Sequence, residues 1–206
     1  MRSRLSRTEQ TEQNRERVLD AARRVFLARG FHTATLDQIA EEAGFSKGAI
    51  YSQFESKADV FLTLLERRIE ERGAKQARFA ARLHGVEAFE ALQTEIARIS
   101  RLEPEWRLVV LEFRVFAARD KALNRRYAEL HRRTIEGVAA LLRLLYERSG
   151  VAPPAPLDLL AANLFAHENG WGLEEAASVT FRAADQSRLL VRMLGARGRR
   201  AERRRA

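Results

Sequence analysis

The sequence predicts an all-α protein of about nine helices. Apolar residues recur at spacings of three and four along most of the chain, which is the period of one face of an α-helix. The apolar–polar alternation of β-strands does not occur in the 206 residues, and neither does an internal repeat. Three prolines, Pro153, Pro154 and Pro156, interrupt the helical pattern and mark a loop between two later helices.

The first element is a flexible basic arm at residues 1–11, followed by a helix at about residues 12–29 that ends at Gly30. Two interpretations of the arm stay open. Its arginines enter the minor groove of DNA, as such arms do elsewhere, or the arm is a solvated tail. These arginines are Arg2, Arg4 and Arg7.

Two short helices joined by a tight turn are expected next. The first, residues 36–43, follows Thr35, whose hydroxyl is a typical N-cap, and precedes Gly44, at a position where a left-handed conformation favours glycine. Ser46 is the N-cap candidate of the second helix, residues 47–54. This arrangement predicts a helix-turn-helix.

The remaining helices form a larger bundle. A fourth helix starts after Ser56 and ends near Gly73, or continues toward Leu83 before the firmer stop at Gly85. Five more helices are expected at about residues 86–102, 105–119, 123–148, 157–177 and 181–196. The helix at 105–119 is apolar on nearly every side, which is typical of a helix at the centre of a bundle.

Composition excludes several classes of protein. Cysteine is absent, so the chain has neither disulfides nor thiolate metal sites, and no apolar run reaches the length of a membrane helix. The N-terminus lacks the apolar segment of a secretory signal, which predicts a cytoplasmic protein. The four histidines match no metal-binding spacing and no glycine-rich phosphate loop is present. We therefore expect no catalytic residues, no metal and no cofactor.

The net charge of +9 supports nucleic-acid binding only weakly. Residues 1–60 hold ten Lys or Arg against nine Asp or Glu, so the helix-turn-helix is almost neutral. Much of the excess lies in an Arg-rich tail at residues 198–206 and just before it. That tail either adds phosphate contacts or is solvated.

The outward face of residues 47–54 has the chemistry to read DNA. Ile50 and Phe54 are four residues apart and face inward, which leaves small and hydrogen-bonding side chains outside. Lysine donates to guanine, an alanine methyl meets a thymine methyl, and a hydroxyl either donates or accepts a hydrogen bond. We expect Lys47, Ala49 and Ser52 at base edges, Tyr51 and Lys57 at phosphates, and Gly48 to allow close approach. Lys57 has an alternative role, because Ser56 and Lys57 also begin the next helix.

The run TLDQIAEEAGFSKGAIYSQFESK resembles the DNA-binding domain of the tetracycline-repressor (TetR) family of bacterial regulators, over about residues 12–65. The resemblance implies a DNA-binding domain at residues 12–56 and an effector-binding and dimerisation domain at residues 57–197. It also implies a homodimer built from the last two helices of each subunit. In that family the positions near the DNA include those matching Thr35, Lys47, Gly48, Ala49, Tyr51, Ser52 and Lys57, and Ser46 is a further DNA-binding candidate.

Aromatic and polar residues of the later helices are candidates for binding a small-molecule effector. A buried carboxylate is costly unless it is paired, so Glu112 and Glu168, which fall within apolar stretches, are the more informative ones. The alternatives are that Glu112 pairs with an arginine and that Glu168 faces solvent or a partner subunit. The candidate ligand-binding residues are Trp106, Glu112, Phe113, Phe116, Tyr127, His131, Phe165, Glu168 and Trp171.

For the dimer interface, the small residues Gly170 and Gly172 allow close approach of helices, and an apolar stripe follows in the last helix. The stripe consists of Leu189, Leu190, Met193 and Leu194. The alternative is packing within one subunit only. Together these features predict a homodimeric repressor that binds an operator in double-stranded DNA and releases it when an unidentified small molecule binds. The alternatives are a constitutive or architectural DNA-binding protein without effector, and a helical-bundle enzyme or carrier.

Overall fold

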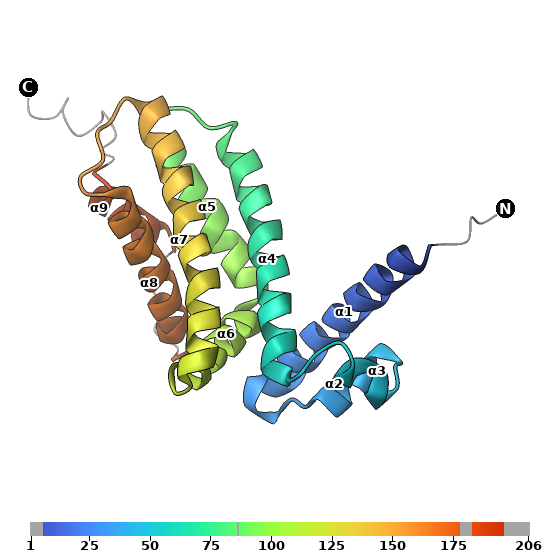
Figure 1. Cartoon of the computed structure of the whole chain (residues 1–206). Helices are drawn as coiled ribbons and strands as arrows, with labels where there is room; N and C mark the ends of the chain where they lie inside the picture. Colours follow the sequence, from blue (N-terminus) through green and yellow to red (C-terminus); the bar gives the residue numbers. More distant parts are fainter. Residues whose placement is uncertain (1–5, 86, 178–182, 196–206) are drawn as a thin grey trace, which may run out of the picture. The chain divides into compact units, whose positions relative to one another are not determined.

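The structure is a computed structural model that describes residues 6–85, 87–177 and 183–195. The described part of the chain contains nine α-helices and no strand, which confirms the predicted fold class (Figure 1). The helices are α1 (Arg7–Thr33), α2 (Leu36–Ala43), α3 (Lys47–Tyr51), α4 (Lys57–Ala80), α5 (Glu87–Leu102), α6 (Pro104–Ala118), α7 (Lys121–Ser149), α8 (Leu157–Ala176) and α9 (Ala183–Met193).

The chain forms two compact units whose borders fall inside helices. The first unit runs to Arg68 and includes Leu108–Tyr127; the second contains Ile69–Arg107 and the chain from Ala128 onward. The border predicted after residue 56 therefore does not coincide with the compact units. The reason is that the first turns of α4 and the later part of α6 belong to the same unit as α1, α2 and α3.

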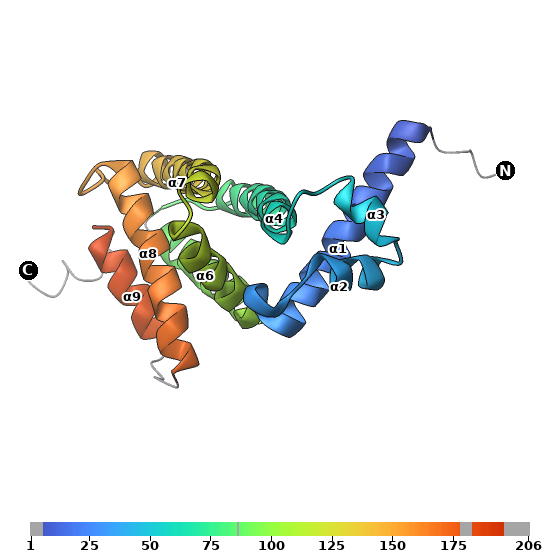
Figure 2. The same ribbon diagram turned by 60° about the horizontal axis from the view of Figure 1, so that its bottom comes forward.

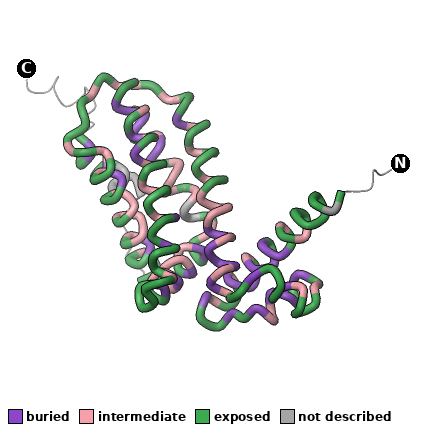
Figure 3. Tube along the Cα trace, viewed as in Figure 1, coloured by how far each residue is buried: buried purple, intermediate pink, exposed green. Residues whose placement is uncertain are grey.

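Helix α1 begins earlier than expected. Ser6 accepts a hydrogen bond from the amide of Glu9 at 3.2 Å, and the Glu9 carboxylate accepts one from the Ser6 amide at 2.7 Å. This capping box makes residues 7–11 helical rather than part of a flexible arm. The first turns are exposed and extend past α2 and α3, which lie beside the later part of α1 (Figures 2 and 3). Arg2, Arg4 and residues 198–206 lie outside the described residues.

The core of the first unit is an aromatic cluster from α1, α4 and α6. The fully buried ring of Phe31 lies 5.8 Å from Phe26, 5.4 Å from Phe61 and 5.1 Å from Phe113, centroid to centroid. Phe61 and Phe113 are 4.5 Å apart. Such aromatic contacts contribute beyond the burial of area. This cluster fixes the start of α4 and the second half of α6 against the end of α1.

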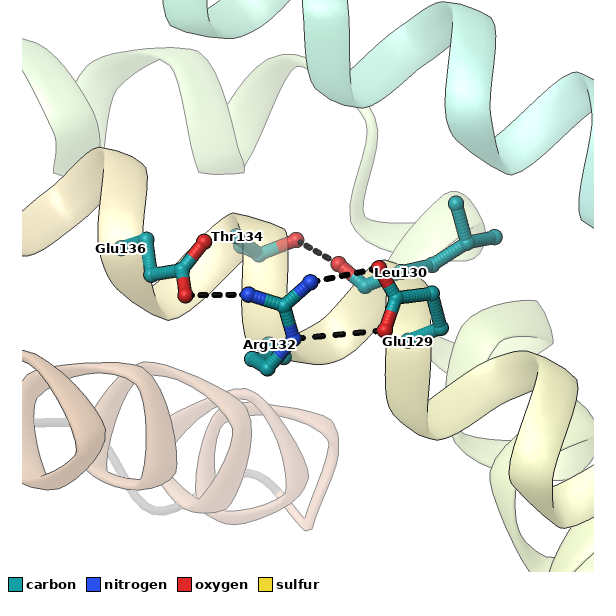
Figure 4. A network of polar contacts seen from close by, with 5 residues as sticks. All are labelled: Glu129, Leu130, Arg132, Thr134 and Glu136. Carbon is teal, nitrogen blue, oxygen red and sulfur yellow. Dashed lines mark hydrogen bonds and ion pairs between the residues drawn. The ribbon is translucent and has the colours of Figure 1, made fainter.

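The core of the second unit joins α5, α7, α8 and α9. Its buried members are Ala88, Phe89, Leu92, Ala139, Leu142, Leu145, Tyr146, Ala161 and Leu194. The hydroxyl of Tyr146 donates to the backbone carbonyl of Leu194 at 2.6 Å, so the end of α9 is tied to α7. The outer face of α7 carries an ion-pair network in which Arg132 lies between Glu129 and Glu136 (Figure 4). Exposed pairs at this spacing add only about 0.2–0.5 kcal/mol each.

Two helix ends differ from the prediction. α3 ends at Tyr51 instead of continuing to Phe54. Beyond it, the amide of Gln53 donates to the carbonyl of Ile50, three residues back, at 3.0 Å. α4 continues past Gly73 to Ala80, the longer of the two predicted alternatives. Arg148 of α7 then donates to the backbone carbonyl of Ala81 at 2.7 Å, which satisfies one carbonyl beyond the end of α4.

Candidate functional site

The turn between α2 and α3 is fixed by caps on both helices. Thr35 accepts from the amide of Gln38 at 3.2 Å, and the side chain of Gln38 accepts from the amide of Thr35 at 3.1 Å. Gly44 has φ 72° and ψ 31°, the left-handed conformation expected there, and Ser46 accepts from the amide of Ala49 at 3.3 Å. The three predicted cap positions are therefore confirmed, and they set the angle at which α3 leaves α2.

α3 presents one buried and one exposed face. Ile50 and Phe54 are buried in the first unit, as the spacing predicted. Lys47, Gly48, Tyr51 and Ser52 are exposed, and Ala49 is half-buried. These residues make up the exposed face of α3, the face that the sequence predicted to meet DNA. This face carries an ammonium, two hydroxyls and a methyl group, and Gly48 has no side chain.

Asp37 of α2 reaches across to this face, and the sequence reasoning did not single it out. Its carboxylate accepts from the ammonium of Lys47 at 2.5 Å and from the hydroxyl of Tyr51 at 3.5 Å. The hydrogen bond from Lys47 to Asp37, and then the charge of that carboxylate, raise the pKa of Lys47. The one signal in the sequence is an aspartate in the first turn of a helix, where the helix dipole favours a negative charge.

Lys57 holds the backbone instead of facing outward. Its ammonium donates to three carbonyl oxygens, those of Phe31 at 2.9 Å, His32 at 2.6 Å and Ala34 at 2.9 Å. An ammonium has three donors, so all of them are used within the chain. Burial lowers the pKa of Lys57, and the charge of Glu112 opposes that shift. The expected phosphate contact by Lys57 is thus replaced by a role in holding residues 30–34, which we call the connector between α1 and α2.

Glu112 of α6 binds the same connector from the amide side. Its carboxylate accepts from the backbone amides of Phe31 at 2.7 Å and His32 at 3.4 Å. Just before them, Gly30 has φ 73° and ψ 170°, a conformation that interrupts α1 and turns these amides toward the carboxylate. The prediction of Glu112 as a ligand-binding residue is therefore corrected: backbone amides, rather than an arginine or a ligand, satisfy it.

Three predicted ligand-binding aromatics also belong to the first unit. Phe113 is fully buried between the rings of Phe31 and Phe61, and Tyr127 meets Phe113 edge-on at 5.9 Å. Phe116 is 38% exposed and packs on Phe31 at 5.2 Å. Phe113 and Tyr127 pack in the core of the first unit, and Phe116 lies at the edge of that core. Packing among aromatic rings, rather than a ligand, accounts for their positions. The apolar character of α6 on all sides indicated burial but not which neighbours bury it.

The other predicted ligand-binding residues lie in the second unit. The ring of His131 meets Phe165 at 4.8 Å, His167 stacks on Trp171 at 5.7 Å, and Trp106 is buried. Glu168 is half-buried in α8. Sequence reasoning placed these residues together with those of the first unit, and the structure divides them between the two units.

A charged network surrounds Glu168 in the second unit. Burial raises the pKa of Glu168 and nearby Glu175 adds to the rise, whereas Arg107, Arg72 and a hydrogen bond with Gln93 oppose it. Arg107 also pairs with Glu175 at 3.4 Å. A Cβ at position 172 would lie 2.2 Å from Cδ of Arg107, so a glycine there is what lets the guanidinium cross α8. Gly172 thus serves packing inside the unit, which corrects its assignment to a partner helix.

The chain's helix-turn-helix matches a known family. The family model described as "Bacterial regulatory proteins, tetR family" matches residues 18–64, which span the later part of α1, α2, α3 and the start of α4. Residues 18–64 therefore form a DNA-binding region of the TetR type. The match contains both capped helices, the exposed face of α3 and Lys57.

Curated relatives support the assignment of this region. The transcriptional regulator SrpR of Pseudomonas putida is 46% identical over 59 residues, which are 29% of this chain and 28% of SrpR. The chain therefore matches less than a third of the length of that relative. UidR of Escherichia coli is 23% identical over 144 residues, which are 70% of this chain and 72% of UidR.

Solved structures share the whole architecture at low identity. FadR of Bacillus subtilis, in complex with stearoyl-CoA, has a TM-score of 0.69 at 15% identity and covers 87% of this chain and 96% of its own. A regulator from Saccharomonospora viridis, in complex with choline, has a TM-score of 0.68 at 23% identity and covers 88% and 94%. These identities establish the fold alone.

The predicted dimer residues divide into two groups. Leu190 and Leu194 are 2% and 4% exposed because they pack within their own unit. Leu189 and Met193 are 54% and 60% exposed. Of the predicted stripe, only the second pair is available to a partner, so the first pair is reassigned to the core. Gly170 is exposed, and a Cβ there would meet nothing within 4 Å.

Across residues 6–85, 87–177 and 183–195, no group of three or more His, Asp or Glu side chains is arranged to hold a metal ion. Within the same ranges, every helix is too short or too polar to cross a membrane.

Proposed function

We propose that this chain is a sequence-specific transcriptional regulator that binds operator DNA as a homodimer and is released from it by a small molecule. The observation that carries the proposal is the exposed face of α3, a short helix held by caps at both sides of its turn. The N-terminus of such a helix is suited to enter the major groove. The match of residues 18–64 to the TetR family model supports the same function.

Each residue of the exposed face of α3 has a role in this proposal. Lys47 donates to guanine O6 and N7, and Ser52 offers a hydroxyl to a neighbouring base. Tyr51 donates to a phosphate, which positions the helix without reading sequence. A Cβ on Gly48 would meet nothing within 4 Å, so the fold itself does not require this glycine. We propose instead that the glycine is required because the DNA must approach α3 closely at this position.

The effector is proposed to bind in the second unit, near Glu168 and Arg107. The ligands of the two solved neighbours, stearoyl-CoA and choline, differ in charge and size. The fold alone therefore does not determine the class of ligand. The ligand class must be inferred from the residues of this chain. A half-buried carboxylate whose ionised form is disfavoured gains from a cationic or hydrogen-bond-donating ligand group. We therefore propose an apolar ligand that carries such a group.

The homodimer is proposed to form through the exposed apolar residues of α8 and α9. Leu189 and Met193 of α9 and Leu173 of α8 are each about half exposed or more, and Gly170 leaves room for a partner helix. A two-fold dimer predicts a near-palindromic operator with half-sites about 34–36 Å apart, or multiples of that distance. A regulator of bacterial genes acts in the cytoplasm, where its operator is.

The test of DNA binding is selection from a random duplex library with the purified chain, followed by binding titrations on the selected sequence. The expected result is a near-palindromic site. Lys47→Ala should cost about 1–3 kcal/mol at one base position in each half-site. Tyr51→Phe is the comparison variant, because it should weaken all sequences alike. Failure of the folded protein to enrich any sequence would contradict the proposed function.

The proposed response to a ligand is tested by adding small cationic and neutral amphiphiles to the operator complex. A ligand that releases DNA must bind the two states of the protein differently, with couplings that are typically about 5–150-fold. Glu168→Gln should weaken the response to cationic compounds and leave operator affinity in their absence unchanged. A chain that binds its operator but responds to none of these compounds would favour the constitutive alternative.

A further inference from the structure

Asp37 accepts hydrogen bonds from Lys47 and Tyr51, two residues that the proposed function places against DNA. We propose that Asp37 competes with DNA for Lys47 and Tyr51, and so weakens the binding of DNA to the exposed face of α3. The inference rests on the proposed function, because it assigns a role to a residue beside the same surface.

The geometry places one carboxylate against two DNA-facing donors. One oxygen of Asp37 lies 2.5 Å from the ammonium of Lys47, and the other lies 3.5 Å from the hydroxyl of Tyr51. The side chains of Lys47 and Asp37 are 69% and 44% exposed, so the pair is at the surface and open to DNA. Asp37 thus stands where the proposal needs a phosphate or a base edge.

The backbone of Asp37 is held in place independently of Lys47. It lies in the first turn of α2, directly after the capping box of Thr35 and Gln38. The amides at this helix end favour a carboxylate. DNA must therefore draw Lys47 away from an anchored negative charge, and the remaining carboxylate then repels the phosphates.

The competition acts unequally on different DNA. At an operator, Lys47 exchanges one carboxylate for two guanine acceptors in fixed positions. On other sequences it exchanges the carboxylate for a phosphate, which offers the same kind of charge and no additional contact. Asp37 should therefore cost affinity on both kinds of DNA. The cost on random DNA should not exceed the cost on the operator, because Lys47 can stay paired with Asp37 where a phosphate offers no gain.

The experiment compares Asp37→Asn with Glu41→Gln, which removes the same charge one turn later on α2, at an exposed position. Binding to operator and to random duplex is measured over a series of salt concentrations. Asp37→Asn should tighten binding to random DNA about two- to fivefold, as expected for an exposed ion pair. It should also steepen the salt dependence by about one counterion, because Lys47 then reaches a phosphate. Glu41→Gln should leave the slope unchanged.

A double-mutant cycle ties the effect to Lys47. In the Lys47→Ala background, Asp37→Asn should do no more than Glu41→Gln, because the donor for which DNA and Asp37 compete is gone. An equal effect of Asp37→Asn in both backgrounds would overturn the competition. Weaker binding by Asp37→Asn alone would overturn it as well, since Asp37 would then position Lys47 for reading.

A readout that needs no DNA separates this inference from the proposed function. Asp37→Asn should lower the pKa of Lys47, measured by NMR titration of its side chain, and Glu41→Gln should change it less. A DNA-binding protein in which both variants leave that pKa unchanged refutes the competition alone. A protein that binds no DNA refutes the proposed function, and the competition with it.

Discussion

Replacing Gly30 with alanine tests how the connector is built. Gly30 has φ 73° and ψ 170°, a conformation that side chains with a Cβ rarely adopt. A Cβ at this position would lie 2.9 and 3.0 Å from the two carboxylate oxygens of Glu112. The substitution therefore strains the backbone and displaces the carboxylate that binds the next two amides.

The expected cost has two parts. Holding a residue other than glycine in such a conformation costs about 1–3 kcal/mol. A hydrogen bond to a charged group, here from the Phe31 amide to Glu112 at 2.7 Å, contributes about 1.5–3 kcal/mol, part of which is lost when the carboxylate moves. We expect Gly30→Ala to lower the free energy of unfolding by about 2–5 kcal/mol, a large share of the roughly 5–15 kcal/mol of a typical domain.

Gly48→Ala is the matched control, since it makes the same chemical change in a helix with open space around the new methyl group. Alanine in a helix is more stable than glycine by about 0.5–1 kcal/mol, so this variant should gain stability. Both are measured by urea denaturation, with circular dichroism to follow helix content. Equal effects of the two substitutions, or a cost of Gly30→Ala below about 1 kcal/mol, would refute the account of the connector.

Three other predictions concern Lys57, Glu168 and the α9 surface. Lys57→Ala should lower the free energy of unfolding by about 2–3 kcal/mol in urea titrations, because three carbonyls lose a charged donor. Burial raises the pKa of Glu168, so the folded state binds its proton more readily than the unfolded state. The free energy of unfolding of the wild type, relative to that of Glu168→Gln, should therefore rise as the pH falls through that raised pKa. It should level off below the ordinary pKa of glutamate. Chemical denaturation over a pH series measures this difference. In sedimentation, Leu189→Glu should give a folded monomer, whereas Leu190→Glu should unfold the chain, because only Leu189 is exposed.

Local sequence signals predicted the helix-turn-helix well. Thr35, Gly44 and Ser46 act within a few residues of their own positions, so their roles follow from the chemistry of helix ends. The inward spacing of Ile50 and Phe54 is local in the same sense. This explains why the exposed face of α3 could be predicted residue by residue.

Contacts between distant residues could not be predicted in this way. Glu112 is 81 residues from the Phe31 amide that it binds, and Lys57 is 26 residues from the carbonyl of the same residue. A carboxylate in an apolar stretch signals a buried partner, but the sequence does not say whether that partner is an arginine, a ligand or the backbone. The partner proved to be the backbone amides of Phe31 and His32, at the end of α1.

The apolar stripe of α9 shows a different limit. Leu189 and Leu190 are neighbours of the same type, yet one is 54% and the other 2% exposed. Helical spacing identifies which residues share a face, but a wide apolar surface serves both the core and a partner. The division between them depends on where α5 and α7 lie, which spacing within α9 does not contain.

The connector uses opposite charges for opposite ends of the peptide group. A helix that stops leaves carbonyls without partners, and the turn that follows leaves amides without partners. Lys57 supplies donors to the carbonyls of Phe31, His32 and Ala34, and Glu112 supplies an acceptor to the amides of Phe31 and His32. Neither charge can be removed without leaving its backbone groups unpaired in a partly buried place, which costs more than the bond itself is worth. The connector leads directly into the N-cap of α2, and α2 positions α3. The orientation of the exposed face of α3 therefore depends on two charges from α4 and α6, neither of which belongs to the helix-turn-helix.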